Sequence, residues 1–309
     1  MLTRERMERM IDAKDNSEAI KVLEECGYGD VSAAGQSLDG MLSAARSAVF
    51  RDIAGAVPDQ NLVAVFQLKY DYHNAKVLVK AQARQEDPQR LLLSGGRYDP
   101  QELLEAWNRD DLRLCSDAFR AALASARDTL AATGDPQQAD LVLDRACYQE
   151  MGSLARESGS AFLEGYVRLS IDVANLRTAV RCARLEKDPE FVGRVLLPGG
   201  NVSTRSIAAA KGEGLRDLFQ TGPLAQAAEL GAKLAQPGAG PLTAFEAMCD
   251  DAVTSYLSAA KRVPFGEQTV IGYLYAKEAE LTTVRTIMSG RMAGLDGDII
   301  RSRLRAAYV

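Results

Sequence analysis

Apolar positions recur at helical spacing along most of this chain. Between residues 59 and 84 helical spacing predicts one long helix, with apolar positions at Leu62, Val65, Phe66, Leu78 and Val79. The stretches 160–185 and 268–289 predict two more. In the last of these, an apolar stripe is formed by Ile271, Leu274, Leu281, Val284 and Met288. No stretch shows the strict alternation of a half-buried strand, so the sequence predicts an all-α fold.

Capping residues and helix breakers predict further helices. Thr3 is a plausible N-cap for a helix to about residue 14, and Asp99-Pro100 and Asp135-Pro136 each place Asp before a Pro suited to a first helical turn. The helix from residue 135 is expected to reach about residue 157. The remaining predicted helices cover about 17–27, 32–53 and 243–261.

The three long helices share a polar pattern: an acid, a small polar residue three positions later, and a base two positions beyond that. The copies are Asp71, Asn74 and Lys76; Asp172, Asn175 and Arg177; and Glu280, Thr283 and Arg285. Their acids are 101 and 108 residues apart (172 − 71 and 280 − 172). Recurrence at such a period indicates one supersecondary unit used three times.

Two of the copies are followed by similar glycine turns, LLLSGG and VLLPGG. Gly290 follows the third acid by only 10 residues (290 − 280), which predicts a third helix that is shorter beyond its motif. Gly and Pro cluster near Gly134 and Pro237-Gly238. The predicted domains are therefore 1–134, 135–237 and 238–309.

Helical geometry separates the roles within each motif. The acid and the small polar residue lie about 60° apart on one face, whereas the base points about 140° away from the acid. The acid and amide are therefore expected to fix a neighbouring loop or helix end by accepting backbone N–H groups. Two interpretations of the pattern remain open. In the first, each motif is a polar pin, meaning that its polar side chains fix one segment of the chain to another within the helix packing. In the second, Lys76, Arg177 and Arg285 line a shared surface that grips a negatively charged partner.

Composition restricts the class of protein. The chain has 309 residues, 47% of them hydrophobic and 26% charged, as in ordinary globular proteins. A net charge of −5 gives no basic footprint for nucleic acid. The five cysteines are scattered without a CxxC pair, which favours reduced, packed thiols in a cytoplasmic protein. No apolar run is long enough to span a bilayer, and the charged N-terminus does not resemble a signal peptide.

The sequence contains few of the side chains and motifs that enzymes use for catalysis. His73 is the sole histidine, so any Ser-His or Cys-His system would have to be built around it, and no P-loop motif is present. The acidic pairs Asp110-Asp111 and Asp250-Asp251 resemble metal-binding carboxylates, but neither extends to a third acid at helical spacing. We therefore predict a non-catalytic protein without cofactor or metal. A helical enzyme that uses carboxylates and a bound metal is the weaker hypothesis.

Several sequence blocks together resemble a known family, the C subunits of V-type (A-type) ATP synthases, which are the counterparts of the d subunit in eukaryotic vacuolar ATPases. The blocks are YDYHNAKVLVKA, the two LLxGG turns and VIGYLYAKEAELTTVRTIMSGR, in which the most specific positions are Tyr273, Tyr275, Glu278, Glu280 and Arg285. The similarity extends across nearly the whole chain. One departure is the start, RERMERMID, which lacks the tyrosine- and arginine-bearing helical lead-in expected of the family.

The resemblance implies a funnel of three similar helical domains with pseudo-threefold symmetry. It also implies a non-catalytic socket at the cytoplasmic face of the membrane, between the rotor ring and a central stalk made by the D and F subunits. Synthase or pump direction and the coupling ion are determined by other parts of such a complex. The alternative is a helical repeat scaffold of another cytoplasmic complex, which accounts for the repeats but not for the blocks.

Overall fold

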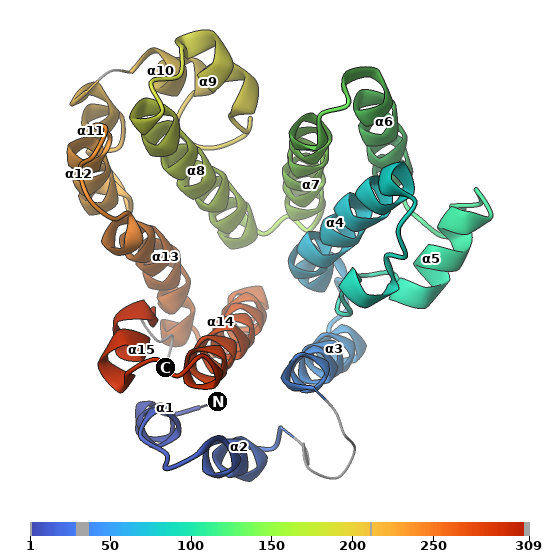
Figure 1. Ribbon diagram of the computed structural model, residues 1–309, viewed down its shortest axis with the longest axis vertical. Helices are drawn as coiled ribbons and strands as arrows, with labels where there is room; N and C mark the ends of the chain where they lie inside the picture. Colours follow the sequence, from blue (N-terminus) through green and yellow to red (C-terminus); the bar gives the residue numbers. More distant parts are fainter. Residues whose placement is uncertain (1, 29–36, 211, 306–309) are drawn as a thin grey trace. The chain divides into compact units, whose positions relative to one another are not determined.

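The three polar motifs lie on the long helices α4 (Asn61–Arg84), α8 (Ala161–Arg184) and α14 (Glu267–Met292). Figure 1 labels these helices in the computed structural model of the chain. The structure describes residues 2–28, 37–210 and 212–305, and within these ranges all regular structure is helical. The predicted all-α class is therefore confirmed. The chain divides into two compact units, one formed by Met1–Pro58 with Thr254–Val309 and the other by Asp59–Val253.

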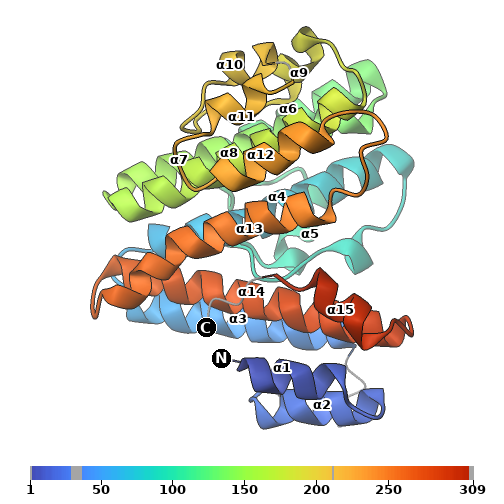
Figure 2. The same ribbon diagram turned by 90° about the vertical axis from the view of Figure 1, so that its left-hand side faces the viewer.

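The first unit joins the two ends of the chain. Two long helices, α3 and α14, pack against each other, and the shorter helices α1, α2 and α15 pack on α14 (Figure 2). The elements of this unit are α1 (Arg4–Ile11), α2 (Asn16–Glu25), α3 (Leu38–Ala56), the 3-10 helix η2 (Ser258–Arg262), α14 (Glu267–Met292) and α15 (Gly297–Arg303).

A continuous apolar cluster holds these helices together. Met10 of α1, Leu23 of α2, Leu42 of α3 and Met288 of α14 are all fully buried in it. Residues from opposite ends of the sequence therefore share one core, and burying such side chains contributes roughly 1.5–3 kcal/mol each.

The second unit contains the first two polar motifs, on α4 and α8. Helix α7 packs on α4, α6 and α8 in this unit. Its elements are α4 (Asn61–Arg84), η1 (Gln89–Leu91), α5 (Pro100–Asn108), α6 (Asp117–Thr133), α7 (Pro136–Glu157), α8 (Ala161–Arg184), α9 (Pro189–Val195), α10 (Thr204–Ala209), α11 (Gly214–Leu218), α12 (Ala225–Leu234) and most of α13 (Thr243–Leu257).

Several predicted helix starts are confirmed. The side chains of Thr3, Asp99, Asp135 and Ser160 each accept a backbone N–H in the first turn of the helix that follows. These caps satisfy donors that a helix cannot satisfy internally. The predicted start of α3 near residue 32 lies outside the described residues. Helix α6 and the short helices α9 to α12 were not anticipated, although the buried residues of α6 recur at helical spacing.

The three motif helices end in the same way. A residue in the left-handed conformation lies 14 positions after each motif acid (85 − 71, 186 − 172 and 294 − 280): Gln85 at φ 57°, Glu186 at φ 51° and Gly294 at φ 69°. In each copy the next N–H donates to a carbonyl of the last turns, namely those of Ala81, Cys182 and Gly290. The repeat seen in the sequence is thus also a repeat of backbone conformation.

The prediction of a shorter third helix is wrong. Helix α14 continues through Gly290 to Met292, 12 residues past its acid, and α8 also ends 12 residues past Asp172 (292 − 280 and 184 − 172). Glycine is needed at position 290 because a Cβ there would lie 2.8 Å from Cγ1 of Ile300 on α15. This glycine permits close helix packing and does not terminate the helix.

The cysteines are free, and all except Cys26 are buried. Burial raises the pKa of Cys115 to about 11, so this thiol stays protonated near neutral pH. Within the described ranges, no helix combines the length and apolar character needed to cross a membrane.

Candidate functional site: the repeated polar pins

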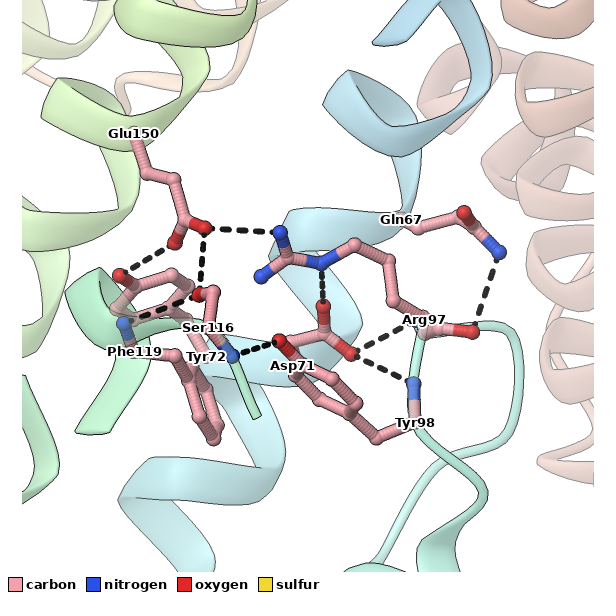
Figure 3. Close-up of polar contacts among 9 residues, drawn as sticks. Gln67, Asp71, Tyr72, Arg97, Tyr98, Ser116, Phe119 and Glu150 are labelled. Atoms are coloured by element: carbon pink, nitrogen blue, oxygen red, sulfur yellow. Dashed lines mark hydrogen bonds and ion pairs between the residues drawn. The ribbon is translucent and has the colours of Figure 1, made fainter. Parts of the chain in front are cut away.

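Asp71 and Asn74 hold the glycine turn that follows their own helix. The fully buried Asp71 carboxylate accepts the backbone N–H of Arg97 at 2.9 Å and the Arg97 Nε–H at 2.7 Å. The Asn74 side chain accepts the Leu93 N–H at 2.8 Å and donates to the Leu93 carbonyl at 2.9 Å. Gln67, on the same helix, donates to the Gly96 carbonyl at 3.1 Å (Figure 3). The acid and the amide of the first motif therefore anchor backbone groups, as their spacing predicted.

Glycine is required at position 96 because the carboxylate lies directly against the turn. A Cβ on Gly96 would overlap Oδ1 of Asp71 and lie 3.2 Å from its Cγ. Gly200 stands in the same relation to Asp172, with a Cβ 3.1 Å from Cγ. The repeated Gly-Gly turns are therefore explained by a close approach between backbone and carboxylate.

Arg97 connects the Asp71 carboxylate to a wider network of polar side chains (Figure 3). Its Nη1 donates to Oε1 of the buried Glu150 at 2.8 Å, and Glu150 also accepts the Tyr72 hydroxyl at 2.8 Å. Ser116, the N-cap of α6, donates to the same carboxylate at 3.0 Å. The loop after α4, the start of α6 and the middle of α7 are thereby joined through one arginine and two acids.

The second pin repeats the first with one substitution. Asp172 accepts the N–H of Asn201 at 3.1 Å and of Val202 at 3.2 Å, and Asn175 exchanges two hydrogen bonds of 2.8 Å with the backbone of Leu197. Asn201 takes the place of Arg97 and donates its side-chain amide to Asp172 at 2.8 Å. The second buried acid therefore has hydrogen bonds but no arginine opposite it.

The third pin holds a different part of the chain. Glu280 accepts the backbone N–H of Leu2, the Tyr28 hydroxyl at 2.5 Å and the Lys277 ammonium at 2.9 Å. Leu2 lies before α1 and Tyr28 after α2, whereas Lys277 lies on α14 itself. Thr283 does not act as Asn74 and Asn175 do, because its hydroxyl donates to the Ala279 carbonyl of its own helix at 2.9 Å.

Each motif base forms an ion pair with an acid on another helix. Lys76 pairs with Asp144 of α7 at 2.6 Å, Arg177 with Asp250 of α13 at 2.7 Å, and Arg285 with Asp39 of α3 at 2.9 Å. This geometry favours the interpretation of the bases as pins within the chain. Their role as partner contacts stays a prediction.

A second ion pair repeats four residues further along the first two motif helices. Lys80 pairs with Asp140 at 3.1 Å, and Arg181 pairs with Glu246 at 2.5 Å. Both bases lie nine positions after their acid (80 − 71 and 181 − 172), where the third copy has Ser289. Sequence analysis missed these residues, although extending the comparison of the copies by one helical turn would have found them.

Burial and hydrogen bonding set the pKa values of the three acids differently. Burial raises the pKa of Asp71 to about 6 despite the opposing Arg97 guanidinium, and it also raises the pKa of Asp172. Burial likewise disfavours the charge of Glu280, but hydrogen bonds from Tyr28, Lys277 and Leu2 hold the pKa of its carboxyl below the ordinary value.

The residues considered for catalysis do not converge. His73 Nε2 lies 3.1 Å from the carbonyl oxygen of Leu91. Asp111 pairs with the nearby Arg113, and Asp250 pairs with Arg177. In the ranges that the structure describes, no three His, Cys, Asp or Glu side chains are placed to hold a metal ion.

These observations define the class of protein. It is an all-helical protein in which one motif is used three times, and the polar residues of the motif fasten the chain's own loops and helices. Comparison with family models then identifies the family, because residues 1–303 match the model described as the ATP synthase (C/AC39) subunit. The chain belongs to this family, as the sequence blocks predicted. Members of the family are non-catalytic parts of A-type and V-type ATP synthases, which supports the prediction that the chain is not an enzyme.

Curated relatives cover most of the chain. It is 28% identical to the C subunit of an A-type ATP synthase of Halorubrum lacusprofundi, over 93% of this chain and 88% of that protein. It is 22% identical to the C subunit of a V-type sodium ATPase of Enterococcus hirae, over 86% of this chain and 81% of that protein. The C subunit of an A-type ATP synthase of Haloferax volcanii is 26% identical, over 79% of this chain and 73% of that protein.

Replacing Gly96 by alanine tests the close approach at the first pin. We expect Gly96→Ala to lower the free energy of unfolding by about 1–3 kcal/mol, because the new methyl group overlaps the buried Asp71 carboxylate. The control is Gly55→Ala on α3, where a Cβ meets nothing within 4 Å, and we expect no loss there. Chemical denaturation of both variants measures the difference. Equal effects at the two positions would contradict the pin.

A double-mutant cycle tests the ion pair between α4 and α7. The variants Lys76→Met and Asp144→Asn, alone and combined, should give a coupling energy of about 1 kcal/mol at low salt that decreases as salt is added. The exposed i,i+4 pair of Glu229 and Lys233 is the matched control, with an expected coupling of about 0.3 kcal/mol. Equal coupling in both pairs would count against a special role for Lys76.

The raised pKa of Asp71 predicts a particular pH dependence. Its folded pKa of about 6 exceeds the ordinary 3.8, so between these values the folded state keeps a proton that the unfolded chain releases. The stability that Asp71 contributes is therefore complete below about pH 4 and is lost as the pH rises to about 6. The measurement is the unfolding free energy of the wild type minus that of Asp71→Asn, which should fall across this range. A value that rises with pH would refute the raised pKa of Asp71.

Proposed function

We propose that this chain is the central-stalk C subunit of an A-type or V-type rotary ATPase. In this role it is a socket that receives the stalk formed by the D and F subunits. It rests on the cytoplasmic loops of the membrane rotor ring, and torque from ATP hydrolysis or from proton or sodium flow passes through it. Membership of the ATP synthase (C/AC39) family carries the proposal, together with the names of the relatives.

The order of the ion pairs supports a threefold arrangement. Each motif helix follows a long helix in the chain: α4 follows α3, α8 follows α7 and α14 follows α13. Lys76 of the first such pair of helices forms an ion pair with α7 of the second, and Arg177 of the second forms one with α13 of the third. Arg285 of the third forms an ion pair with α3 of the first. Such cyclic pairing is what three equivalent units around one axis require.

This order leads us to propose the funnel with pseudo-threefold symmetry as the arrangement of the chain. The domains 1–134, 135–237 and 238–309 are part of the proposal, since each contains one motif helix.

The buried pins support a mechanical role. A protein that transmits torque must resist twisting, so its loops and helices must be fastened by contacts that do not exchange with solvent. The Asp71 and Asp172 carboxylates are buried and hold backbone groups 26 to 30 residues away in sequence (97 − 71 and 202 − 172). Because these carboxylates are buried, water does not compete for the hydrogen bonds that fix the turns.

Membrane vesicles from cells that lack the gene for this chain provide the test. We expect them to hydrolyse ATP without ATP-driven ion uptake, and expression of the wild-type chain to restore the uptake. Affinity purification of the chain should recover the D and F stalk subunits and the protein of the rotor ring. The variant Glu229→Gln, at an exposed ion pair, should restore uptake as the wild type does.

Two results would contradict the proposal. One is unchanged coupling in the absence of the chain. The other is co-purification with the components of an unrelated cytoplasmic complex, which would favour the helical scaffold.

A further inference from the structure

The turn between η2 and α14 exposes an aromatic side chain. Phe265 lies in this turn with 86% of its surface exposed, the largest fraction among the exposed large hydrophobic residues of the described chain. The neighbouring Pro264 is also exposed, and Val263 is half-buried. A side chain of this size normally lies in a core or at an interface, so its position requires an explanation.

The exposure of Phe265 results from an ordered turn. Val263 donates its N–H to the Ala260 carbonyl at 3.1 Å, and the Thr269 hydroxyl donates to the Val263 carbonyl at 3.1 Å. Gly266, at φ 110°, takes a conformation that a residue with a side chain rarely adopts, and its carbonyl accepts the Thr269 N–H at 3.2 Å. These bonds fix the backbone on both sides of Phe265 and present its ring to solvent.

The last turn of α3 lies at the same end of this unit. Helices α3 and α14 run antiparallel, because Asp39 near the start of α3 pairs with Arg285 while Arg46 pairs with Glu278 nearer the start of α14 (Figure 2). The C-terminus of α3 therefore lies beside the N-terminus of α14. Its last residues, Ile53-Ala54-Gly55-Ala56, and the C-cap Val57 carry no charge and follow the exposed ion pair of Arg51 and Asp52. Apolar residues from two segments thus meet at one end of the unit.

Basic side chains adjoin this apolar end. Lys261 and Arg262, both exposed, immediately precede the turn on η2. Glu267 is the acid next to the turn and begins α14, where a carboxylate is favoured by the helix dipole. The whole chain has a net charge of −5, so two adjacent bases beside an exposed phenylalanine depart from its general character.

We propose that this turn is a membrane-surface contact, in which Phe265 enters the interface of a bilayer containing anionic phospholipid and Lys261 and Arg262 lie at its phosphate groups. An aromatic ring is stable at the boundary between headgroups and acyl chains, and lysine and arginine near that boundary are attracted to anionic lipid. A lipid surface also needs no complementary pocket, which suits a single projecting ring better than a protein partner does.

The inference extends the proposed position of the chain at a membrane ring. It rests on the proposed function only for the presence of a nearby membrane. A binding experiment with lipid vesicles contains neither stalk nor ring. The lipid contact can therefore fail while the role in the rotary ATPase stands, and that role can fail while the vesicles still bind.

The sole tryptophan of the chain makes the test direct. In the full-length variant Trp107→Phe, a second change Phe265→Trp places the only indole at the tip of the turn. We expect its emission to shift to shorter wavelength with vesicles of phosphatidylcholine and phosphatidylglycerol, and to be quenched by bromine-labelled acyl chains. Vesicles of phosphatidylcholine alone should give a weaker response, and Lys261→Gln with Arg262→Gln should reduce the response to the anionic vesicles to that weaker level.

The matched control is Leu185→Trp in the same Trp107→Phe background, at a position that is 67% exposed in the other unit. No shift is expected there. The proposal is overturned if the indole at position 265 shows no response at millimolar lipid, if the two positions respond equally, or if the response ignores the two basic residues. It is also overturned if only purified ring protein in detergent shifts the emission, since a protein pocket would then hold Phe265. Thermal unfolding confirms that each variant is folded.

Discussion

A buried acid that accepts backbone N–H groups from a distant segment is the interaction on which this structure depends. Asp71 and Asp172 each fix the glycine turn after their helix, and Glu280 fixes the segment that leads into α1. The contact is strong because a charge removed from water requires several donors, and the backbone supplies them in fixed positions. Each long motif helix thereby determines the course of a short non-helical segment, a glycine turn or the residues before α1.

The bases of the same motifs extend the order from loops to whole helices. Because the base points about 140° away from the acid, one helix holds a loop with one face and another helix with the next. The ion pairs of Lys76, Arg177 and Arg285 are partly exposed, so solvent screens them and each contributes little to stability. Their contribution lies in fixing the register of neighbouring helices.

The three copies differ where their surroundings differ. Asp71 is opposed by Arg97, which also reaches Glu150, whereas Asp172 has only the neutral Asn201 beside it. Glu280 holds the segment before α1 and the Tyr28 hydroxyl, and Thr283 has turned back to its own helix. The acid and the helix end are common to all copies, while the partners are adapted to the segment that each copy must hold.

The sequence alone determined the helical class, the long helices, several helix caps and the threefold motif, because these features depend on spacing and local propensity within a single element. It also indicated that the acid and amide hold backbone groups. Only the tertiary structure decided which groups these are, since the Leu93 and Arg97 N–H groups are brought to α4 by the path of the chain. Gly290 shows the same limit: in sequence it resembles a helix stop, and the presence of Ile300 on α15 makes it a packing residue inside α14. Contacts between distant segments have no periodic signal, and so the pairings of Lys76, Arg177 and Arg285 required the fold.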